Sequence, residues 1–190
     1  MIIKTFEDET FKNKDFSIAD FSPTDFEGCS FIGCNFTNTN LSKSNFIDCT
    51  FELCDFSMAK VDQTSFQNIE FISCKLMGVN FKDCKPFLLS FSFNSCNLMY
   101  SSFYKLKLKK TAFINCDLTE VDFIETNLEQ SQFSKSNLNL AQFQFTNLIK
   151  SDFREAYNYS IILKENKVDG CKFSKDEIHG LLTDYNILIE

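Results

Sequence analysis

The sequence predicts an all-β solenoid built from stacked five-residue units. An apolar residue recurs at every fifth position from Phe11 to Phe81 and, after a shift of two residues, again from Phe93 to Phe153; all twenty-eight of these centres are Phe, Leu or Val. Two residues before most centres the side chain is small, and Asp or Asn often stands between the two. A period of five fits neither an α-helix nor a simple strand. It describes a short extended segment followed by a turn, and such units must stack to bury their centres.

The composition bounds the class of protein. The 190 residues fit one domain or two small ones, and 44% hydrophobic residues, with 24 Phe, exclude a disordered chain. The net charge of -7 argues against direct binding of nucleic acid, which requires a basic surface. No apolar run is long enough to span a membrane, and residues 1–9 do not resemble a signal peptide. The predicted location is therefore the cytoplasm.

The unit small–Asp/Asn–Phe/Leu–x–x resembles the pentapeptide-repeat family over roughly residues 11–173. The resemblance implies a right-handed quadrilateral β-helix of about seven to eight coils, with one repeat on each face and four in each coil. With about 4.8 Å between stacked strands, the repeats would form a rod about 34 Å long. We accordingly divide the chain into an N-terminal cap (1–10), a first block (11–83), a phase break (84–92), a second block (93–173) and a C-terminal helix and tail (174–190).

A coil of twenty residues predicts which side chains stack in the core. The predicted core includes Phe31, Phe51 and Phe71 in one column, Phe36 and Phe56 in the next, and Cys34, Cys54 and Cys74 in an inward column beside them. All nine cysteines occupy the small position, where Cys29 with Cys49 and Cys96 with Cys116 would form two further columns. Disulfides and zinc are the alternatives, but parallel side chains in a straight column suit neither. We predict free, buried thiols and no metal or other cofactor.

The repeat breaks between Phe81 and Phe93, where the spacing is twelve and ten is expected. Two extra residues and Pro86 predict a bulge or kink. The preceding segment, residues 74–81, is similar to the one before the coil interruption in gyrase-interacting relatives, the Qnr-type quinolone-resistance proteins and the albicidin-immunity proteins. The resemblance implies a partner-binding site at the break; the alternative is a bulge that the solenoid merely tolerates. The candidate residues are Lys85, Pro86, Phe87, Leu88 and Leu89.

The C-terminal residues predict a helical cap. Ser174 and Glu177 have the spacing of a capping box, and a helix of about ten residues would follow. Residues 156–159 resemble the segment that closes the last coil in the same relatives, where the C-terminal cap is the dimer contact. The resemblance therefore implies a homodimer; a monomeric cap is the alternative. The candidate interface residues are Ile178, Leu181, Leu182, Ile187, Leu188 and Ile189.

No pattern in the sequence supports an enzyme. His179 is the single histidine, and no nucleophile elbow, phosphate-binding loop or metalloprotease motif occurs. The resemblance instead implies a DNA-mimic-like protein that binds DNA gyrase or topoisomerase IV and protects it from quinolones or peptide toxins. The alternative is an interaction scaffold without a topoisomerase partner.

The net charge limits how closely this chain could mimic DNA. B-DNA would carry about 20 charges over a rod of this length, whereas this chain has a net charge of -7. Residues 1–83 carry 13 acidic and 7 basic side chains, so the acidity is concentrated in the first block. A basic cluster, Lys105, Lys107, Lys109 and Lys110, is either a solvated surface or a site.

Overall fold

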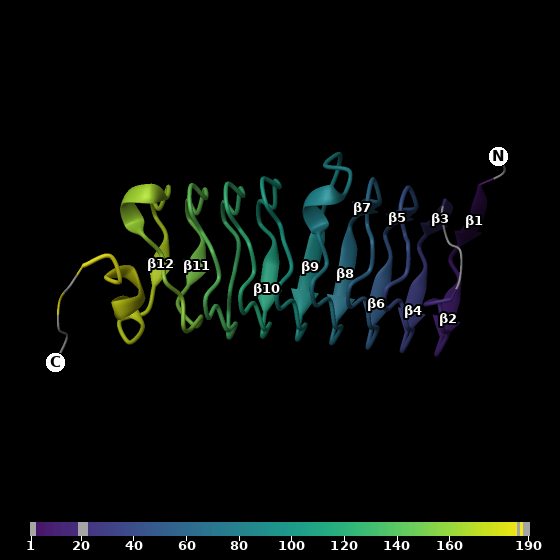
Figure 1. The fold of residues 1–190 in the computed structure, drawn as a ribbon, viewed down its shortest axis with the longest axis horizontal. Helices are drawn as coiled ribbons and strands as arrows, with labels where there is room; N and C mark the ends of the chain where they lie inside the picture. Colours follow the sequence, from purple (N-terminus) through teal and green to yellow (C-terminus); the bar gives the residue numbers. More distant parts are fainter. Residues whose placement is uncertain (1–2, 19–22, 186, 188–190) are drawn as a thin grey trace.

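Successive coils stack side by side into a rod, with β1 (Lys4–Glu7) near one end and β12 (Lys172–Phe173) near the other (Figure 1). The computed structural model describes residues 3–18, 23–185 and 187. The fold is the predicted right-handed, quadrilateral, parallel β-helix, with about eight turns and almost no helix. Within the described residues, no helix is long and apolar enough to cross a membrane.

Short parallel strands form on two faces of the coil. One sheet has the order β1-β3-β5-β7, the second β10-β9-β8-β6-β4-β2, and β11 pairs with β12 near the C-terminal end. The strands are β1 (Lys4–Glu7), β2 (Thr10–Lys12), β3 (Thr24–Glu27), β4 (Ser30–Ile32), β5 (Asn45–Ile47), β6 (Thr50–Glu52), β7 (Ser65–Gln67), β8 (Ile69–Ile72), β9 (Phe91–Asn94), β10 (Ala112–Ile114), β11 (Asp152–Phe153) and β12 (Lys172–Phe173). Single turns of 3-10 helix occur at η1 (Phe81–Asp83), η2 (Leu163–Glu165) and η3 (Ile178–Leu181). Residues 1–10, the predicted cap, contain β1 and the start of β2.

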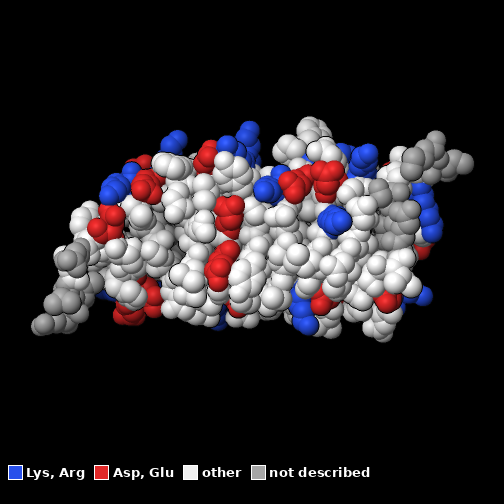
Figure 2. Space-filling model, viewed as in Figure 1, with Lys and Arg blue, Asp and Glu red and all other residues white. Residues whose placement is uncertain are grey.

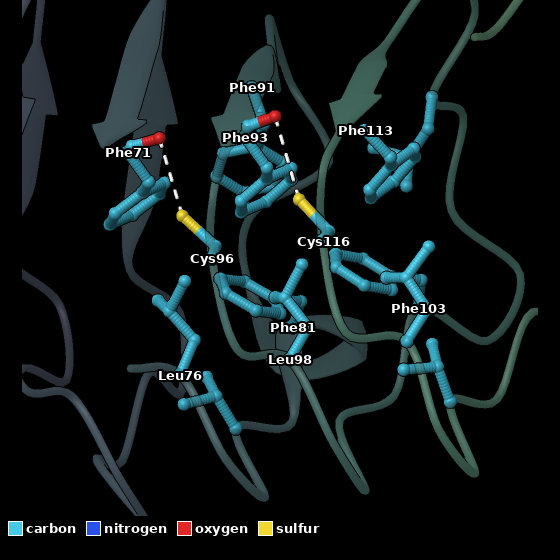
Figure 3. Packing of buried hydrophobic residues seen from close by; sticks show 14 of the residues in the cluster. Phe71, Leu76, Phe81, Phe91, Phe93, Cys96, Leu98, Phe103, Phe113 and Cys116 are labelled. Atoms are coloured by element: carbon cyan, nitrogen blue, oxygen red, sulfur yellow. Dashed lines mark hydrogen bonds between the residues drawn. The ribbon is translucent and has the colours of Figure 1, made fainter. Parts of the chain in front are cut away.

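The register between coils is twenty residues, as predicted. Phe31 pairs with Phe51 and Phe51 with Phe71. Their rings stack with centroids 4.7 and 5.2 Å apart, and the predicted core residues are buried. Across the break the offset becomes 22, because Phe71 pairs with Phe93. The stacked column therefore continues without interruption through the rod (Figure 3).

The 22-residue offset corrects one prediction about the cysteines. Lys75 pairs with Asn97, so Cys96 and Cys116 continue the column of Cys34, Cys54 and Cys74 and do not form a separate one. The two extra residues form a loop outside the rod before the chain returns to this column, so the inward column stays in line. All nine cysteines are free.

The residue between the small position and the centre controls the turn. Asn35 Oδ1 accepts a hydrogen bond of 3.0 Å from the backbone N–H of Thr37, and Asp55 does the same for Ser57 at 2.9 Å. This is the local side-chain-to-backbone bond that Asn and Asp favour in turns. The second residue after most centres takes a left-handed conformation, which falls on residues such as Leu53 (φ 54°) and Phe145 (φ 57°).

The small position does more than save space. At many small positions a Cys, Ser or Thr side chain donates a hydrogen bond to the carbonyl of a centre residue one coil back, which helps to satisfy a buried carbonyl at the corner; Ser101 Oγ, which has no such partner, is an exception. Thr126 bonds the Phe103 carbonyl at 2.9 Å and Ser136 that of Phe113 at 3.0 Å. In Figure 3 the thiols of Cys96 and Cys116 reach the carbonyls of Phe71 and Phe93 in the same way. Thr, Ser and Cys are therefore interchangeable here for a reason beyond their size.

We expect Cys74→Ser to lower the free energy of unfolding by less than about 1 kcal/mol, and Cys74→Ala by about 1–3 kcal/mol. Serine keeps a donor for the Phe51 carbonyl, which the Cys74 thiol reaches at 3.3 Å, whereas alanine leaves that carbonyl unsatisfied. Urea unfolding would measure both. Cys84 is buried and bonds no carbonyl of the described residues, so Cys84→Ser should show no such advantage over Cys84→Ala. Equal losses for the two Cys74 variants would contradict the bonding role.

Candidate protein-binding surface

The register break forms a loop that projects from the side of the rod. The loop stands above the coil next to β9 in Figure 1. Its two ends are fixed to the preceding coil, because the Lys85 N–H bonds the Thr64 carbonyl at 2.9 Å and the Ser90 N–H bonds that of Phe66 at 3.2 Å. The extra residues therefore lie between two anchored points, and the coils on either side keep their stacking.

The tip of the loop is apolar and exposed. Phe87 is 73% and Leu88 61% exposed, and Pro86 is exposed beside them. The protrusion on the upper edge in Figure 2 has no charged side chain at its crest. A projecting aromatic and aliphatic pair on a rigid support is suited to bind a pocket on another protein.

Two of the five candidate residues at the break face elsewhere. Leu89 is half-buried and packs against the core, so it anchors the loop instead of presenting a surface. Lys85 is half-buried and its Nζ lies 3.4 Å from Asn45 Oδ1 of an earlier coil. The structure thus brings Pro86, Phe87 and Leu88 together at the tip. The sequence alone did not distinguish them from Leu89.

Lysines stand on the C-terminal side of the loop. Lys105 and Lys109 form ion pairs with Glu125 at 3.5 Å and Glu129 at 2.8 Å, each one coil further on. The Tyr104 side chain, and then the Glu125 carboxylate, raise the pKa of Lys105. Lys107 and Lys110 are exposed and form no ion pair with a described residue.

The N-terminal side of the loop differs in charge. A surface hollow of about 380 Å³ there includes the base of the loop at Ser90 and the side chains of Asp48 and Glu70. The loop therefore separates an acidic surface on its N-terminal side from a basic surface on its C-terminal side, and the electrostatic potential rises from the first to the second.

The C-terminal end is a second candidate surface, and here the predicted helix was wrong. The predicted α-helix of about ten residues is the single 3-10 turn η3. Ser174 Oγ does accept a bond of 3.2 Å from the Glu177 N–H, as a capping box requires. The Glu177 carboxylate, however, accepts from the Asn158 N–H of the preceding coil, so it does not complete the box.

Close packing against the last coil explains the short turn. The Ile161 N–H bonds the Gly180 carbonyl at 2.9 Å, and a Cβ at Gly180 would clash with the backbone carbonyl oxygen of Tyr159. The chain must therefore follow the coil closely at this point. Glycine in the middle of the segment also disfavours a regular helix.

The predicted dimer residues differ in exposure. Ile178 and Ile187 are exposed, whereas Leu181 is only 7% exposed and belongs to the core. Leu182 is half-buried, and Leu188 and Ile189 lie outside the described residues. The homodimer remains a prediction, and Ile178 and Ile187 are the candidates that reach the surface.

The described part of the chain holds no cluster of three or more His, Cys, Asp or Glu side chains that could bind a metal ion. His179 Nε2 lies 3.8 Å from Glu177 Oε2 at the C-terminal end.

Two family models match the sequence. One, described as pentapeptide repeats in eight copies, matches residues 19–57, and the other, described as a pentapeptide repeat region, matches residues 87–173. Together they account for well over half of the chain. A comparison with curated protein sequences gave no match.

Similar solved structures include three of QnrB1, described as a plasmid-mediated fluoroquinolone resistance protein. A trypsin-treated variant superimposes with a TM-score of 0.80 at 20% identity, over all of both chains. A second trypsin-treated variant gives 0.64 at 19% identity, over 99% of this chain and 98% of the other. The full-length protein gives 0.51 at 20% identity, over 96% of this chain and all of QnrB1. At these identities the similarity shows the shared fold.

Proposed function

The chain belongs to the pentapeptide-repeat family, and from that premise we propose that it is a non-catalytic protein that binds a type II topoisomerase, DNA gyrase or topoisomerase IV, through the loop at the register break. Such binding would modulate the enzyme or protect it from quinolones or peptide toxins in the cytoplasm. Repeat solenoids serve many roles, so the proposal depends on the site and not on the fold alone.

The exposed loop tip is the observation that carries the proposal. A solenoid gains no stability from Phe87 and Leu88 at 73% and 61% exposure, because neither side chain is buried. The loop leaves the rod at the register break, and the coils around it stay in line. The shared fold with a fluoroquinolone resistance protein supports a topoisomerase as the partner.

Acidity supports a limited DNA mimicry. The acidic residues of the first block and the hollow beside Asp48 and Glu70 give one half of the rod a negative surface. A homodimer through the C-terminal end would place these acidic halves at the outer tips. The rod would then resemble DNA in shape and in local charge rather than in overall charge density.

One experiment tests both the topoisomerase proposal and the alternative of an interaction scaffold. Purified protein is titrated into a gyrase supercoiling assay with and without ciprofloxacin. Inhibition of supercoiling, or relief of the inhibition caused by the drug, is the expected result. If supercoiling is unchanged in both arms and gyrase subunits do not copurify with the tagged protein, the topoisomerase proposal fails and the scaffold function replaces it.

A further inference from the structure

A basic patch interrupts this acidic molecule beside the loop. Residues 84–116 contain five lysines and no Asp or Glu, although the whole chain has a net charge of -7. We define the lysine patch as Lys107, Lys109 and Lys110, because the Lys85 side chain reaches back to Asn45, two coils earlier. Lys109 alone of these forms an ion pair with a described residue, Glu129.

The fold brings these lysines close together. Asn80 pairs with Ser102 across the break, and Phe71 with Phe93, so the coil that contains Lys107 follows directly after the loop. Lys109 and Lys110 follow in the adjoining turn, next to the coil that carries the loop. Like charges in neighbouring positions of a ladder destabilise a sheet.

Elsewhere the rod neutralises a lysine with a carboxylate one coil away. Lys75 with Asp55, Lys105 with Glu125 and Lys164 with Asp184 are all separated by twenty residues. At Lys107 the partner in the next coil is Asn127, which carries no charge. Lys109 follows the same arrangement with Glu129, so Lys107 and Lys110 are the two patch lysines that depart from it.

We infer that the lysine patch and the loop tip form one docking surface for an acidic segment of a partner protein, with Phe87 and Leu88 in an apolar pocket of that partner and the patch against its carboxylates. The inference rests on the proposed function in one respect: the acidic segment would belong to the topoisomerase.

Charge and shape favour an acidic protein over a nucleic acid. The exposed apolar tip adjoins the patch, and an apolar anchor surrounded by charges is typical of protein interfaces. On the other side of the loop, Asp48 and Glu70 would repel a phosphate backbone that extended across it. The same two carboxylates orient the partner, because its acidic segment is attracted only toward the C-terminal side.

The test compares two charge-reversal variants of the full chain. Lys107→Glu/Lys110→Glu reverses the charge of the two patch lysines that form no ion pair with a described residue. Lys60→Glu/Lys135→Glu makes the same change in charge elsewhere on the rod. Lys60 and Lys107 each stand one residue before a centre, and Lys110 and Lys135 both have a left-handed backbone and are exposed. Thermal unfolding checks that both variants fold. The probes are purified gyrase, a short labelled oligoglutamate peptide and a short DNA duplex.

We expect oligoglutamate to bind the wild type and the control variant, and the patch variant at least about tenfold more weakly. With gyrase, the association rate of the patch variant should fall by about tenfold or more at low salt, and the difference should shrink as ionic strength rises from about 0.05 M to about 0.3 M.

The outcomes separate this inference from the proposed function. Oligoglutamate binding with no gyrase binding would keep the acidic docking surface and remove the topoisomerase. Gyrase binding that is equal in the two variants, or oligoglutamate binding that is equal or absent, would overturn the docking surface. Tighter binding of the duplex than of oligoglutamate would overturn the choice of a protein partner.

Discussion

Phe51→Ala is expected to lower the free energy of unfolding by about 3–5 kcal/mol. The Phe51 ring is fully buried and lies between the rings of Phe31 and Phe71, with centroids 4.7 and 5.2 Å away. It also meets Phe56 edge to face at 4.9 Å. Its removal leaves a cavity with coils on both sides, and neither coil can move inward without breaking its own hydrogen bonds to the next. Chemical denaturation followed by circular dichroism would measure the loss.

The matched control is Phe11→Ala, in the same column near the N-terminal end. Phe11 stacks on Phe31 at 4.9 Å and is only partly buried. Its removal should cost clearly less, because the stability of a solenoid depends on interfaces between neighbouring coils and this residue takes part in fewer of them. Equal losses at the two sites would be incompatible with a stacked column.

Deleting Pro86 and Phe87 is expected to abolish any effect on gyrase while leaving the rod intact. The deletion joins Lys85 to Leu88, so that Cys84, Lys85 and Leu88 read as small residue, outward residue and centre, and it returns the spacing between Phe71 and Phe93 to twenty. The free energy of unfolding should stay close to that of the wild type, because Leu88 becomes a buried centre while Leu89, which packs against the core in the wild type, becomes the first residue after that centre and turns outward. The supercoiling assay with ciprofloxacin measures the activity, and thermal unfolding measures the stability.

A point substitution separates the loop tip from its length. Leu88→Ser removes an exposed leucine in a left-handed turn, and Leu140→Ser removes a comparable one, with exposures of 61% and 64% and φ angles of 55° and 58°. Leu88→Ser should weaken the effect on gyrase and Leu140→Ser should not. A fully active deletion variant, or equal effects of the two serine substitutions, would exclude the loop as the binding element.

The core was predictable because each centre contributes its side chain independently to one column. The five-residue period fixes which residues point inward, and the twenty-residue register follows once four units make a coil. Phe31, Phe51 and Phe71 are therefore stacked as predicted. The column that Cys96 joins was harder to predict, because it depended on where in the coil the extra residues leave the rod.

The ends and the break depend on contacts that have no period. Leu89 and Leu181 were expected at surfaces, but each packs against the core. Their direction is set by tertiary contacts, at Leu181 by the close approach of Gly180 to Tyr159 and at Leu89 by the anchors of the loop. Hydrophobic residues in a loop give no sequence signal for which of them turns inward. The left-handed turn residues were equally hidden, since Leu53 and Phe145 lack the usual preference for that conformation.

The thiols along the inner columns also make the rod resistant to chemical attack. The reactive species is the thiolate, and burial raises the pKa of Cys49 and of Cys171 to about 12, and that of Cys84 well above its ordinary value. At neutral pH these groups stay protonated, and Cys49 and Cys84 are also shielded as long as their coils are stacked. Oxidants and alkylating agents therefore reach Cys49 and Cys84, which are both buried, only where a coil has opened. Because Cys29 lies toward the N-terminal end and Cys74 and Cys96 lie near the middle, all three buried, the order in which these thiols react records whether the rod opens first at its N-terminal end.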